Sequence, residues 1–415
     1  MNSPWYKLVL VALLVSATLF IGGRRSSGDF PVYYLAAQRL RNGDDLYRIV
    51  PDEVYSYPPF AAFVCVPLTF MPQRAAQWVW GGLQAIALVL VIHLALLLSR
   101  RERAALTPRQ QVCLVGAAVL IGARHLLSPL ENAQTDLMIA LLCFAAVYWI
   151  GMGWPIAAGV LLGAAIGLKA TPLLFVPFLL RWRQWKAATA AVVAAIVLNL
   201  APSMIFPSPL PKLHAVEWIE SLARPAVANG PAAARPGVWK EFTQLNQSLG
   251  GLLARLFING AEDHGPLLWG LGHRGVQIVF LAIAALLMIV AATVRQGHWY
   301  GWPKAPLILT GYDASVVLCL MLLFSPKTSK AHLCSLILPI LLLTARAVRA
   351  PKSAASIGWL VIGVGVGVLT KNLVGRQLAN WLLDYGYLTW FILVILAYLW
   401  FWRTTDELEP VPVSR

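Results

Sequence analysis

The sequence is poor in charge. Asp, Glu, Lys and Arg together make up only 12% of its 415 residues, whereas 59% are hydrophobic. A soluble domain is about a quarter charged and about half apolar, and a disordered chain is still poorer in apolar residues. This composition therefore excludes both a water-soluble globular protein and a disordered one.

Cysteine is also scarce. The chain has five, and each lies in or beside an apolar run: Cys65, Cys113, Cys143, Cys319 and Cys334. Their number is odd and no two have the C-x-x-C spacing of a metal or redox site, so a disulfide scaffold is excluded. We interpret all five as small, buried hydrophobic side chains.

The motifs of several common chemistries are missing as well. The sequence has no D-x-D or E-x-D pair for a metal diphosphate, no H-E-x-x-H, no G-x-S-x-G and no Walker loop. Each of these motifs places ligands or backbone groups for one kind of reaction. We therefore predict neither a metal site nor a cofactor.

Long apolar runs, in contrast, occur throughout the chain. A helix needs about 20 apolar residues to cross a bilayer, and ten runs come near this length, at roughly 5–23, 76–98, 110–127, 136–150, 186–205, 275–294, 305–324, 332–348, 355–370 and 386–402. A signal peptide is the alternative for 5–23, but this run is long for the apolar h-region of a signal peptide and lacks an A-x-A cleavage site.

The run at 154–180 is too long for one comfortable crossing and short for two. Lys169 and Pro172 lie in its middle, where proline interrupts a helix. We predict a helical hairpin with a broken turn, which brings the total to about twelve crossings. The predicted fold is thus an all-α polytopic membrane domain over residues 1–402, followed by a short polar tail at 403–415.

Short basic flanks predict the orientation. The net charge of +15 is spread over many loops, and the segments 99–109, 181–186 and 346–352 are rich in Lys and Arg. Such short segments favour the cytoplasm, and only a hairpin with two crossings puts all three on one side. We therefore expect a cell (inner) membrane protein with both termini in the cytoplasm and two long outer loops, 24–75 and 206–274.

The first outer loop contains a predicted amphipathic helix over 29–40. Phe30, Tyr33, Tyr34 and Ala37 recur at helical spacing, as in helices that lie at the membrane interface. The apolar segment 55–72 is interrupted by prolines, which indicates a second interface or re-entrant segment. Asp29 at the start of the helix has two interpretations: an N-cap, or a carboxylate that acts as a general base on a hydroxyl.

Other polar residues gather on the same predicted side. The segment 123–136 carries Arg124, His125, Glu131, Asn132, Gln134 and Asp136. The segment 325–332 carries Lys327, Lys330 and His332, although lysines in a short outer loop go against the positive-inside bias. Binding of an anion such as phosphate explains them, and lysines that reach lipid headgroups are the alternative.

Lys169 is costly inside the membrane, by about 2.5–3.5 kcal/mol on insertion scales, so we expect it to face a cavity or a partner. At a broken hairpin tip it would point outward. The alternative is that the tip simply reaches water. Asp313, in the predicted crossing 305–324, is interpreted as a packing residue.

Several segments together resemble one enzyme family. These are GDFPVYYLAAQRLRNGDDLY, YSYPPFAAFVCVPLTFMP, ENAQTDLMIALL, AAIGLKATPLLFVPFLLRWRQWKA, LNQSLGGLLARLF and LLFSPKTSKAHLCSLILP, which cover most of the chain from about 28 to 345. In order and spacing they resemble the bacterial polyprenol-phosphate-mannose-dependent α-mannosyltransferases of glycosyltransferase family 87. This family belongs to the C-type membrane glycosyltransferases, which use a lipid-phosphate sugar outside the cytoplasm.

The resemblance implies a set of site residues. The family's proposed catalytic base is matched by Asp29, and the His that ends its S-P block is matched by His332. Four cations would bind the donor phosphate: Lys327, Lys330, Lys169 and Arg124. The acceptor pocket would contain Tyr33, Glu131, Asn132, Gln134 and Asn246. The expected reaction moves one sugar, with inversion, from a polyprenyl-phosphate donor to a glycan or glycolipid acceptor, without metal or nucleic acid.

Alternatives remain open. In this family an aromatic residue is common between the S-P pair and the His, whereas this chain has KTSKA, and mycobacterial arabinofuranosyltransferases are similar too. The donor sugar is therefore mannose or arabinofuranose. A lipid-linked-sugar flippase or a glycan ligase would also suit a polytopic chain with buried cations.

Overall fold

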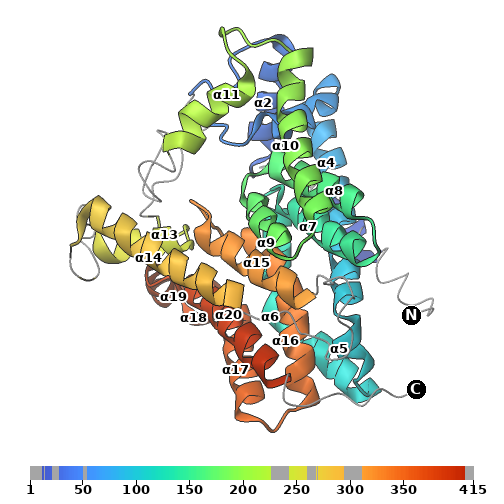
Figure 1. Cartoon of the computed structure of the whole chain (residues 1–415), viewed down its shortest axis with the longest axis vertical. Coiled ribbons are helices and arrows are strands. Elements are labelled where there is room, and N and C mark those ends of the chain that lie inside the picture. The colour runs from blue at the N-terminus through green and yellow to red at the C-terminus, as the bar shows by residue number, and fades with distance from the viewer. Residues whose placement is uncertain are drawn as a thin grey trace. The chain divides into compact units, whose positions relative to one another are not determined.

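The structure is a computed structural model that describes residues 12–13, 15–20, 28–49, 54–225, 243–258, 268, 270–293 and 311–406. Within these residues the secondary structure is helical and contains no strand. The chain divides into two compact units (Figure 1). The first holds Met1–Leu97, His125–Glu241 and Lys330–Ser335, and the second holds Leu98–Arg124, Phe242–Ser329 and Leu336–Arg415.

The long helices agree with the predicted crossings to within a few residues. They are α4 (Gln73–Leu98), α6 (Pro108–Glu131), α7 (Asp136–Gly151), α10 (Trp185–Ile205), α14 (Gly272–Thr293), α15 (Gly311–Phe324), α16 (Ile337–Arg349), α17 (Ala354–Val368) and α20 (Tyr387–Asp406). The predicted crossing at 5–23, the start of 305–324 and most of the tail at 403–415 lie at least partly outside the described residues.

Length and composition identify the helices that can cross a bilayer. In the described part five qualify, namely α4, α6, α10, Gly272–Ala292 in α14 and His332–Arg349, which joins η5 (His332–Leu336) to α16. The bent pair α19 (Arg376–Asp384) and α20 gives a sixth if it counts as one span, and six more apolar helices have 10–17 residues. The described helices that pass this test are thus fewer than the twelve crossings predicted.

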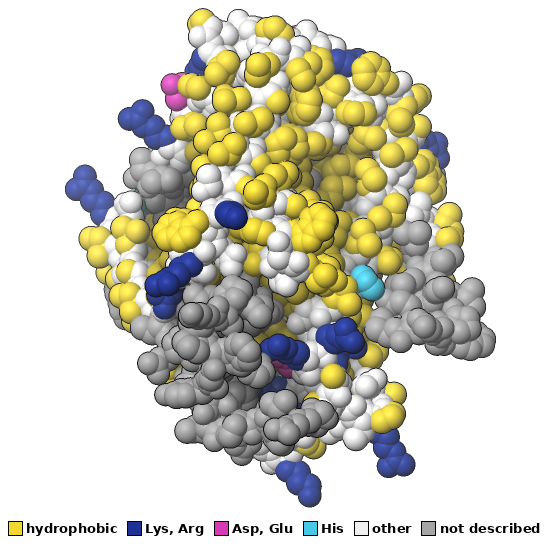
Figure 2. Space-filling model, turned by 45° about the vertical axis from the view of Figure 1, so that its right-hand side comes forward, with side chains coloured by type: hydrophobic (Ala, Val, Ile, Leu, Met, Phe, Trp, Pro, Cys, Tyr) yellow, Lys and Arg dark blue, Asp and Glu magenta, His cyan; other side chains and the backbone are white. Residues whose placement is uncertain are grey.

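The outer faces of these helices are apolar. On α4, Leu83 and Leu90 are exposed while Trp80 and Gln84 are buried, and on α14 Ile278 is 68% exposed. Figure 2 shows hydrophobic side chains over broad areas of one face, with Lys and Arg between them few. An apolar exterior around helices of this length is the arrangement expected in lipid, and the protein is a multi-pass membrane protein.

The run at 154–180 breaks where proline and lysine predict it. Helix α8 (Pro155–Leu168) ends at Lys169, whose backbone is extended (φ −158°, ψ 131°), and η2 (Thr171–Leu174) and α9 (Phe175–Arg181) follow. The break is confirmed. Since η2 and α9 together would extend only about 17–19 Å, the second arm is shorter than the hydrocarbon core of about 30 Å.

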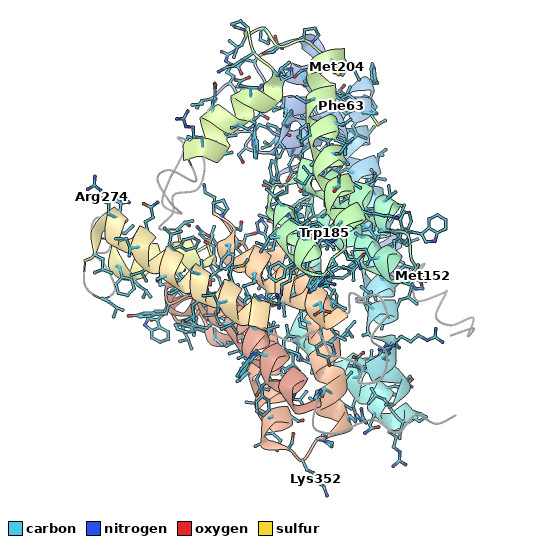
Figure 3. The ribbon with its side chains drawn as sticks, in the orientation of Figure 1. Phe63, Met152, Trp185, Met204, Arg274 and Lys352 are labelled. Carbon is cyan, nitrogen blue, oxygen red and sulfur yellow. The ribbon has the colours of Figure 1, made fainter. Side chains whose placement is uncertain are left out.

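The chain nevertheless turns back between α8 and α10. Gly159 lies against Ala187 and Ala191, and Gly163 lies against Ala194, so both helices advance in the same direction along their contact. Their N-terminal ends therefore lie at one end of the pair. At that end Met152 and Trp185, labelled in Figure 3, are both exposed.

Close packing without side chains sets the distance between α8 and α10. A Cβ on Gly163 would lie 2.5 Å from the Cβ of Ala194, well inside van der Waals contact. Gly159 and Gly163 thus form a small-x-x-x-small stripe, which lets helix backbones approach in membranes. This stripe fixes the separation of α8 and α10.

Helix α2 (Phe30–Asn42) confirms the predicted helix but not its surroundings. Its apolar residues Phe30, Tyr33, Tyr34 and Ala37 are all buried, and the helix contacts α3 (Pro59–Phe63) and η1 (Val66–Phe70). Its apolar face therefore packs on protein rather than on lipid. Short-range periodicity predicts an apolar face equally well in both cases.

Two other predictions are corrected by the structure. The segment 123–136 is mostly helix, since α6 continues to Glu131 and leaves only a short turn before Asp136. All five cysteines are free thiols, but Cys113 is exposed on α6 whereas the other four are buried. An apolar residue in a membrane helix can face lipid as well as protein, and the sequence alone does not separate these cases.

Candidate functional site

The Asp29 side chain does not cap α2. Within the described residues it accepts no hydrogen bond from the first turn of the helix, where Pro31 occupies one of the first two positions. Its Oδ2 instead accepts a hydrogen bond from Nε2 of Gln134 at 2.6 Å. The carboxylate is thus directed toward the turn between α6 and α7, and the N-cap interpretation is wrong for the side chain.

Three hydrogen bonds, one from Asp29 and two from α4, hold the turn formed by residues 132–135. The Asp29 backbone N–H donates to the Asn132 carbonyl at 2.9 Å, and Trp80 Nε1 donates to the Ala133 carbonyl at 2.9 Å. Gln84 Nε2 donates to the Gln134 carbonyl. Ala133 has a positive φ of 50°, a conformation that costs energy for a residue with a side chain. The surrounding bonds therefore maintain the conformation that presents Gln134 to Asp29.

Gly28 permits this close approach. Its φ is +54°, and a Cβ at this position would overlap the backbone of Asn132. A residue with a side chain would separate the start of α2 from the turn at 132–135. Gly28 thus allows Asp29 to lie directly against this turn.

A second carboxylate lies beside a lysine and a histidine. Asp136 Oδ1 lies 3.0 Å from Lys169 Nζ and 3.6 Å from His332 Nε2, and the three side chains are 7%, 14% and 13% exposed. Asp136 begins α7, Lys169 follows α8 and His332 begins η5. A lysine inside the membrane needs a partner because burial of its charge is unfavourable, and Asp136 is this partner for Lys169.

The surroundings of Asp29 favour proton acceptance. Burial raises the pKa of the Asp29 carboxyl above its ordinary value, and the charge of Asp136 adds to this, while the hydrogen bond from Gln134 and the charge of Lys169 lower it. The net shift is upward. A carboxylate with a raised pKa is a stronger base than an ordinary aspartate.

Three aromatic residues pack against one another near Asp29. The Tyr33 hydroxyl donates to the Tyr57 hydroxyl at 3.1 Å, and the Tyr33 ring lies 5.6 Å from the Trp80 ring between centroids. Burial and the nearby Asp29 carboxylate raise the pKa of both tyrosines. Both hydroxyls therefore remain protonated at neutral pH, and the fully buried Tyr33 uses its hydroxyl to hold Tyr57.

The first unit thus brings together most of the predicted site. It contains Asp29, Tyr33, Glu131, Asn132, Gln134, Lys169, Lys330 and His332. Asp136 is predicted from the sequence only as one of several polar residues and an alternative base, and the sequence does not predict Trp80, Gln84 or Tyr57 as site residues. Gln84 was detectable as a polar side chain within an apolar helix, which in membranes indicates a hydrogen-bonding function.

Three predicted residues belong to the second unit. Asn246 is fully buried: its Oδ1 accepts from the backbone N–H of Ser248 (3.2 Å) and Thr328 (3.1 Å), and its Nδ2 donates to the Pro326 carbonyl (3.1 Å). It therefore holds the segment that carries Lys327. Arg124, the third residue, hydrogen-bonds within the second unit as well.

Comparison with known families identifies the class of enzyme. The model of glycosyltransferase family 87 matches residues 55–326. The chain belongs to glycosyltransferase family 87. It is therefore a glycosyltransferase, as the resemblance of its segments predicted. The match includes Gln134, Asp136 and Lys169, whereas Asp29 and His332 lie outside the matched residues.

Several relatives have named activities. The chain is 26% identical over 307 residues to the polyprenol-phosphate-mannose-dependent alpha-(1-2)-phosphatidylinositol pentamannoside mannosyltransferase of Mycolicibacterium smegmatis, covering 71% of this chain and 67% of the relative. It is 28% identical over 219 residues to an alpha-(1->3)-arabinofuranosyltransferase of Mycobacterium tuberculosis, covering 50% of this chain and 48% of that protein. The chain thus spans about half the length of the second relative.

A solved structure is also similar. The crystal structure of ArnT from Cupriavidus metallidurans bound to undecaprenyl phosphate has a TM-score of 0.41 and 15% sequence identity, and the match covers 98% of this chain and 79% of ArnT.

Proposed function

We propose that this glycosyltransferase moves one sugar, most simply mannose, from a polyprenyl-phosphate donor to a glycan or glycolipid acceptor. The observation that carries this proposal is the geometry around Asp29, a half-buried carboxylate that is free of any capping role and held by Gln134. The name of the M. smegmatis relative supports the polyprenol-phosphate donor and mannose. The similarity to an arabinofuranosyltransferase makes arabinofuranose the second candidate.

In the proposed reaction Asp29 is the general base. It takes the proton of an acceptor hydroxyl while that oxygen forms a bond to the anomeric carbon of the donor sugar. The bond from the anomeric carbon to the phosphate oxygen breaks, and polyprenyl phosphate leaves with the electron pair. Because attack and departure occur on opposite faces, the configuration at the anomeric carbon inverts. Tyr33 and Gln134, with Glu131 and Asn132 beside them, are the proposed acceptor contacts.

Cationic side chains stabilise the phosphate in this proposal. Lys169 and His332 both lie against the Asp136 carboxylate, which offsets part of the lysine charge and fixes the direction of both side chains. Lys327 and Lys330 supply further charge for the donor phosphate. Preorganised cations are worth most where negative charge develops, as on a departing phosphate. Asn246 then acts through the segment that it holds and not through contact with acceptor.

The proposed topology follows from the basic segments. We expect about twelve crossings in an inner membrane, with both termini in the cytoplasm and Asp29 on the outer side. The shared direction of α8 and α10 supports a returning chain between them. A single cysteine introduced at position 103 should react with an impermeant maleimide only from the cytoplasmic side, and one at Ser208 only from the outside. Reaction of both from the same side would overturn this orientation.

A defined assay tests the function. Membranes containing the protein are incubated with a short-chain polyprenyl-phosphate mannose, or its arabinofuranose counterpart, and a radiolabelled acceptor fraction. The expected product is the acceptor lengthened by one sugar, formed by wild type and not by Asp29→Asn. Transfer of a preassembled oligosaccharide instead would indicate a ligase, and movement of the donor across vesicles without a product would indicate a flippase.

A further inference from the structure

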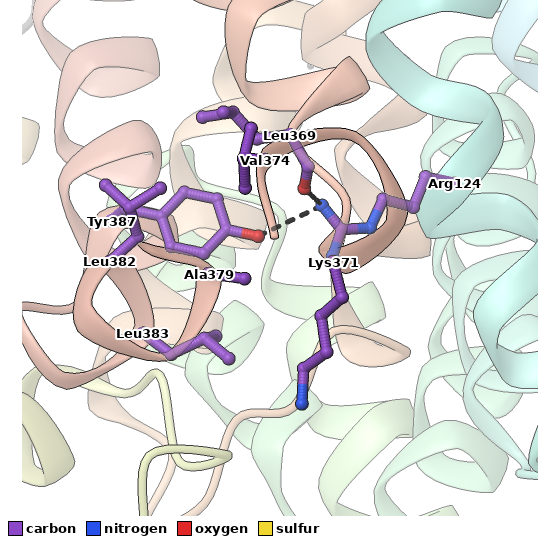
Figure 4. A pocket seen from close by; sticks show the side chains of 8 residues that line it. All are labelled: Arg124, Leu369, Lys371, Val374, Ala379, Leu382, Leu383 and Tyr387. Carbon is purple, nitrogen blue, oxygen red and sulfur yellow. Dashed lines mark hydrogen bonds between the residues drawn. The ribbon is translucent and has the colours of Figure 1, made fainter. Parts of the chain in front are cut away.

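A pocket in the second unit contains two cations: Arg124, which the family resemblance assigns to the donor phosphate, and Lys371, which has no assigned role. It is lined by Arg124, Leu369, Lys371, Val374, Ala379, Leu382, Leu383 and Tyr387 (Figure 4). Apart from the Arg124, Lys371 and Tyr387 head groups, its walls are aliphatic. The lining therefore combines strong positive charge with apolar surface.

Helix packing places Arg124 at this pocket. Gly367 of α17 lies against the backbone of Leu120 and Ile121 on α6, where a side chain would not fit. This contact brings the end of α17 beside Arg124, whose Nη1 donates to the Leu369 carbonyl and to the Tyr387 hydroxyl, the latter at 3.1 Å. A guanidinium has five N–H donors, so a group fixed by Nη1 keeps others for a ligand.

The two cations lack acidic partners in the described part of the chain. Neither Arg124 nor Lys371 forms an ion pair with a carboxylate described there. Asp384, the acidic residue of α19, acts electrostatically on Arg255. Two cations without an acidic partner among the described residues, beside apolar walls, favour an anionic ligand.

The surrounding segment is suited to the membrane interface. Helices α18 (Lys371–Val374) and α19 expose Leu373, Leu378 and Trp381 by 67%, 47% and 53%, while Ala379 is buried. A charged segment with exposed apolar and Trp side chains, between α17 and α20, is typical of chain that lies at headgroup depth. An anion at this depth is most simply the phosphate of a lipid.

The surface beside the two cations is apolar. A lipid whose phosphate lies at Arg124 and Lys371 would place its tail along the exposed side chains of Leu373, Leu378 and Trp381. We propose that the pocket of Arg124, Lys371 and Tyr387 binds the phosphate of a single membrane amphiphile, either a polyprenyl phosphate or a phospholipid. This inference rests on the proposed function only for its polyprenyl-phosphate arm.

Binding can be measured without sugar transfer. The full-length protein in phosphatidylcholine nanodiscs is titrated with farnesyl phosphate, and farnesol, which lacks the phosphate, serves as the ligand control. Lys371→Gln should weaken farnesyl phosphate binding about tenfold, which corresponds to about 1.4 kcal/mol, and should leave the weak binding of farnesol unchanged. Raising the ionic strength should reduce the difference.

A matched variant controls for loss of charge alone. Lys352 is exposed on the turn between α16 and α17 and projects from the protein in Figure 3. Lys352→Gln should bind farnesyl phosphate as wild type does. Arg124→Gln should also weaken binding, but it removes the bonds to Leu369 and Tyr387, so Lys371→Gln is the deciding variant.

The outcomes separate the sources of the phosphate. Displacement of farnesyl phosphate by nanodiscs containing phosphatidic acid assigns the pocket to phospholipid, and resistance to it assigns the pocket to polyprenyl phosphate. If inorganic phosphate binds as tightly as farnesyl phosphate, the site is not a lipid site and the proposal is overturned. Binding of farnesyl phosphate by Lys371→Gln with wild-type affinity would overturn it as well. Because Asp29→Asn should retain binding, failure of transfer and failure of this pocket are distinguishable.

Discussion

Replacing Asp29 by Asn removes the proposed base and little else. Asn can still accept the hydrogen bond that Gln134 Nε2 now gives at 2.6 Å, and no capping bond is lost because the described part of α2 receives none from this side chain. A general base contributes about 10²- to 10⁴-fold, or about 2.7–5.4 kcal/mol of transition-state stabilisation. We expect transfer by Asp29→Asn to fall by at least about 100-fold.

Asp29→Asn should not lower the thermal stability of the protein, and it can raise it. Burial raises the pKa of the folded Asp29 above its unfolded value, so the native state loses stability as the pH rises through this range and the carboxylate ionises. Asn carries no charge, which predicts an unfolding midpoint at neutral pH equal to or above that of wild type. Transfer is measured with a short-chain donor, and the midpoint by thermal unfolding in detergent.

Asp44→Asn is the matched control, since Asp44 is exposed just after the same helix. It should retain wild-type transfer. If Asp29→Asn keeps more than about a tenth of the activity, the assignment of the base is refuted, and Glu131, Asp136 and His332 become the candidates.

Three further predictions concern the same unit. Gln134→Leu removes the hydrogen bond that lowers the pKa of Asp29; because the base must be ionised, the acidic limb of kcat/KM against pH should move to higher pH. Asp136→Leu leaves Lys169 buried without its partner and should destabilise the protein by about 3–5 kcal/mol, whereas adding Lys169→Met should recover much of this loss. Gly163→Ala places a methyl group against α10 and should cost about 1–3 kcal/mol in unfolding measurements.

Each of these predictions has an outcome that contradicts it. If the acidic limb of kcat/KM in Gln134→Leu stays at the same pH or moves to lower pH, the Gln134 amide does not lower the pKa of Asp29. Additive losses in the double variant of Asp136 and Lys169 would show that the two charges are not coupled. A Cβ at Gly82 would meet no atom within 4 Å, so Gly82→Ala serves as the control. If Gly163→Ala is as stable as Gly82→Ala, the role of close packing is refuted.

Local patterns predicted the elements of this fold well. Runs of about 20 apolar residues gave most helices to within a few positions, and Pro172 with Lys169 gave the break after α8. These features depend on hydrophobicity and backbone chemistry that act within one turn or one helix. The direction in which an apolar face points is not local, which is why the surroundings of α2 and the exposure of Cys113 were predicted wrongly.

The site depends on contacts between distant parts of the chain. Asp29 and Gln134 are 105 residues apart, and Gln84 reaches the same turn from α4. Helical spacing does not encode such pairs, so the sequence suggested the residue types but not their partners. The role of Asp136 was missed for the same reason, because it depends on Lys169 and His332, which come from distant parts of the chain.

The order of synthesis gives the Asp136–Lys169 pair a further consequence. The two residues are 33 positions apart, so at about 5–20 residues per second the ribosome adds the lysine about 2–7 s after the carboxylate. Helix α7, which contacts α8, can therefore supply the counter-ion while α8 enters the bilayer, and the lysine is inserted as half of a neutral pair. His332 joins them only when most of the chain has been made. Insertion of these helices is thus independent of the last member of the cluster, and a nascent chain that stops before η5 would carry a correctly inserted but incomplete site.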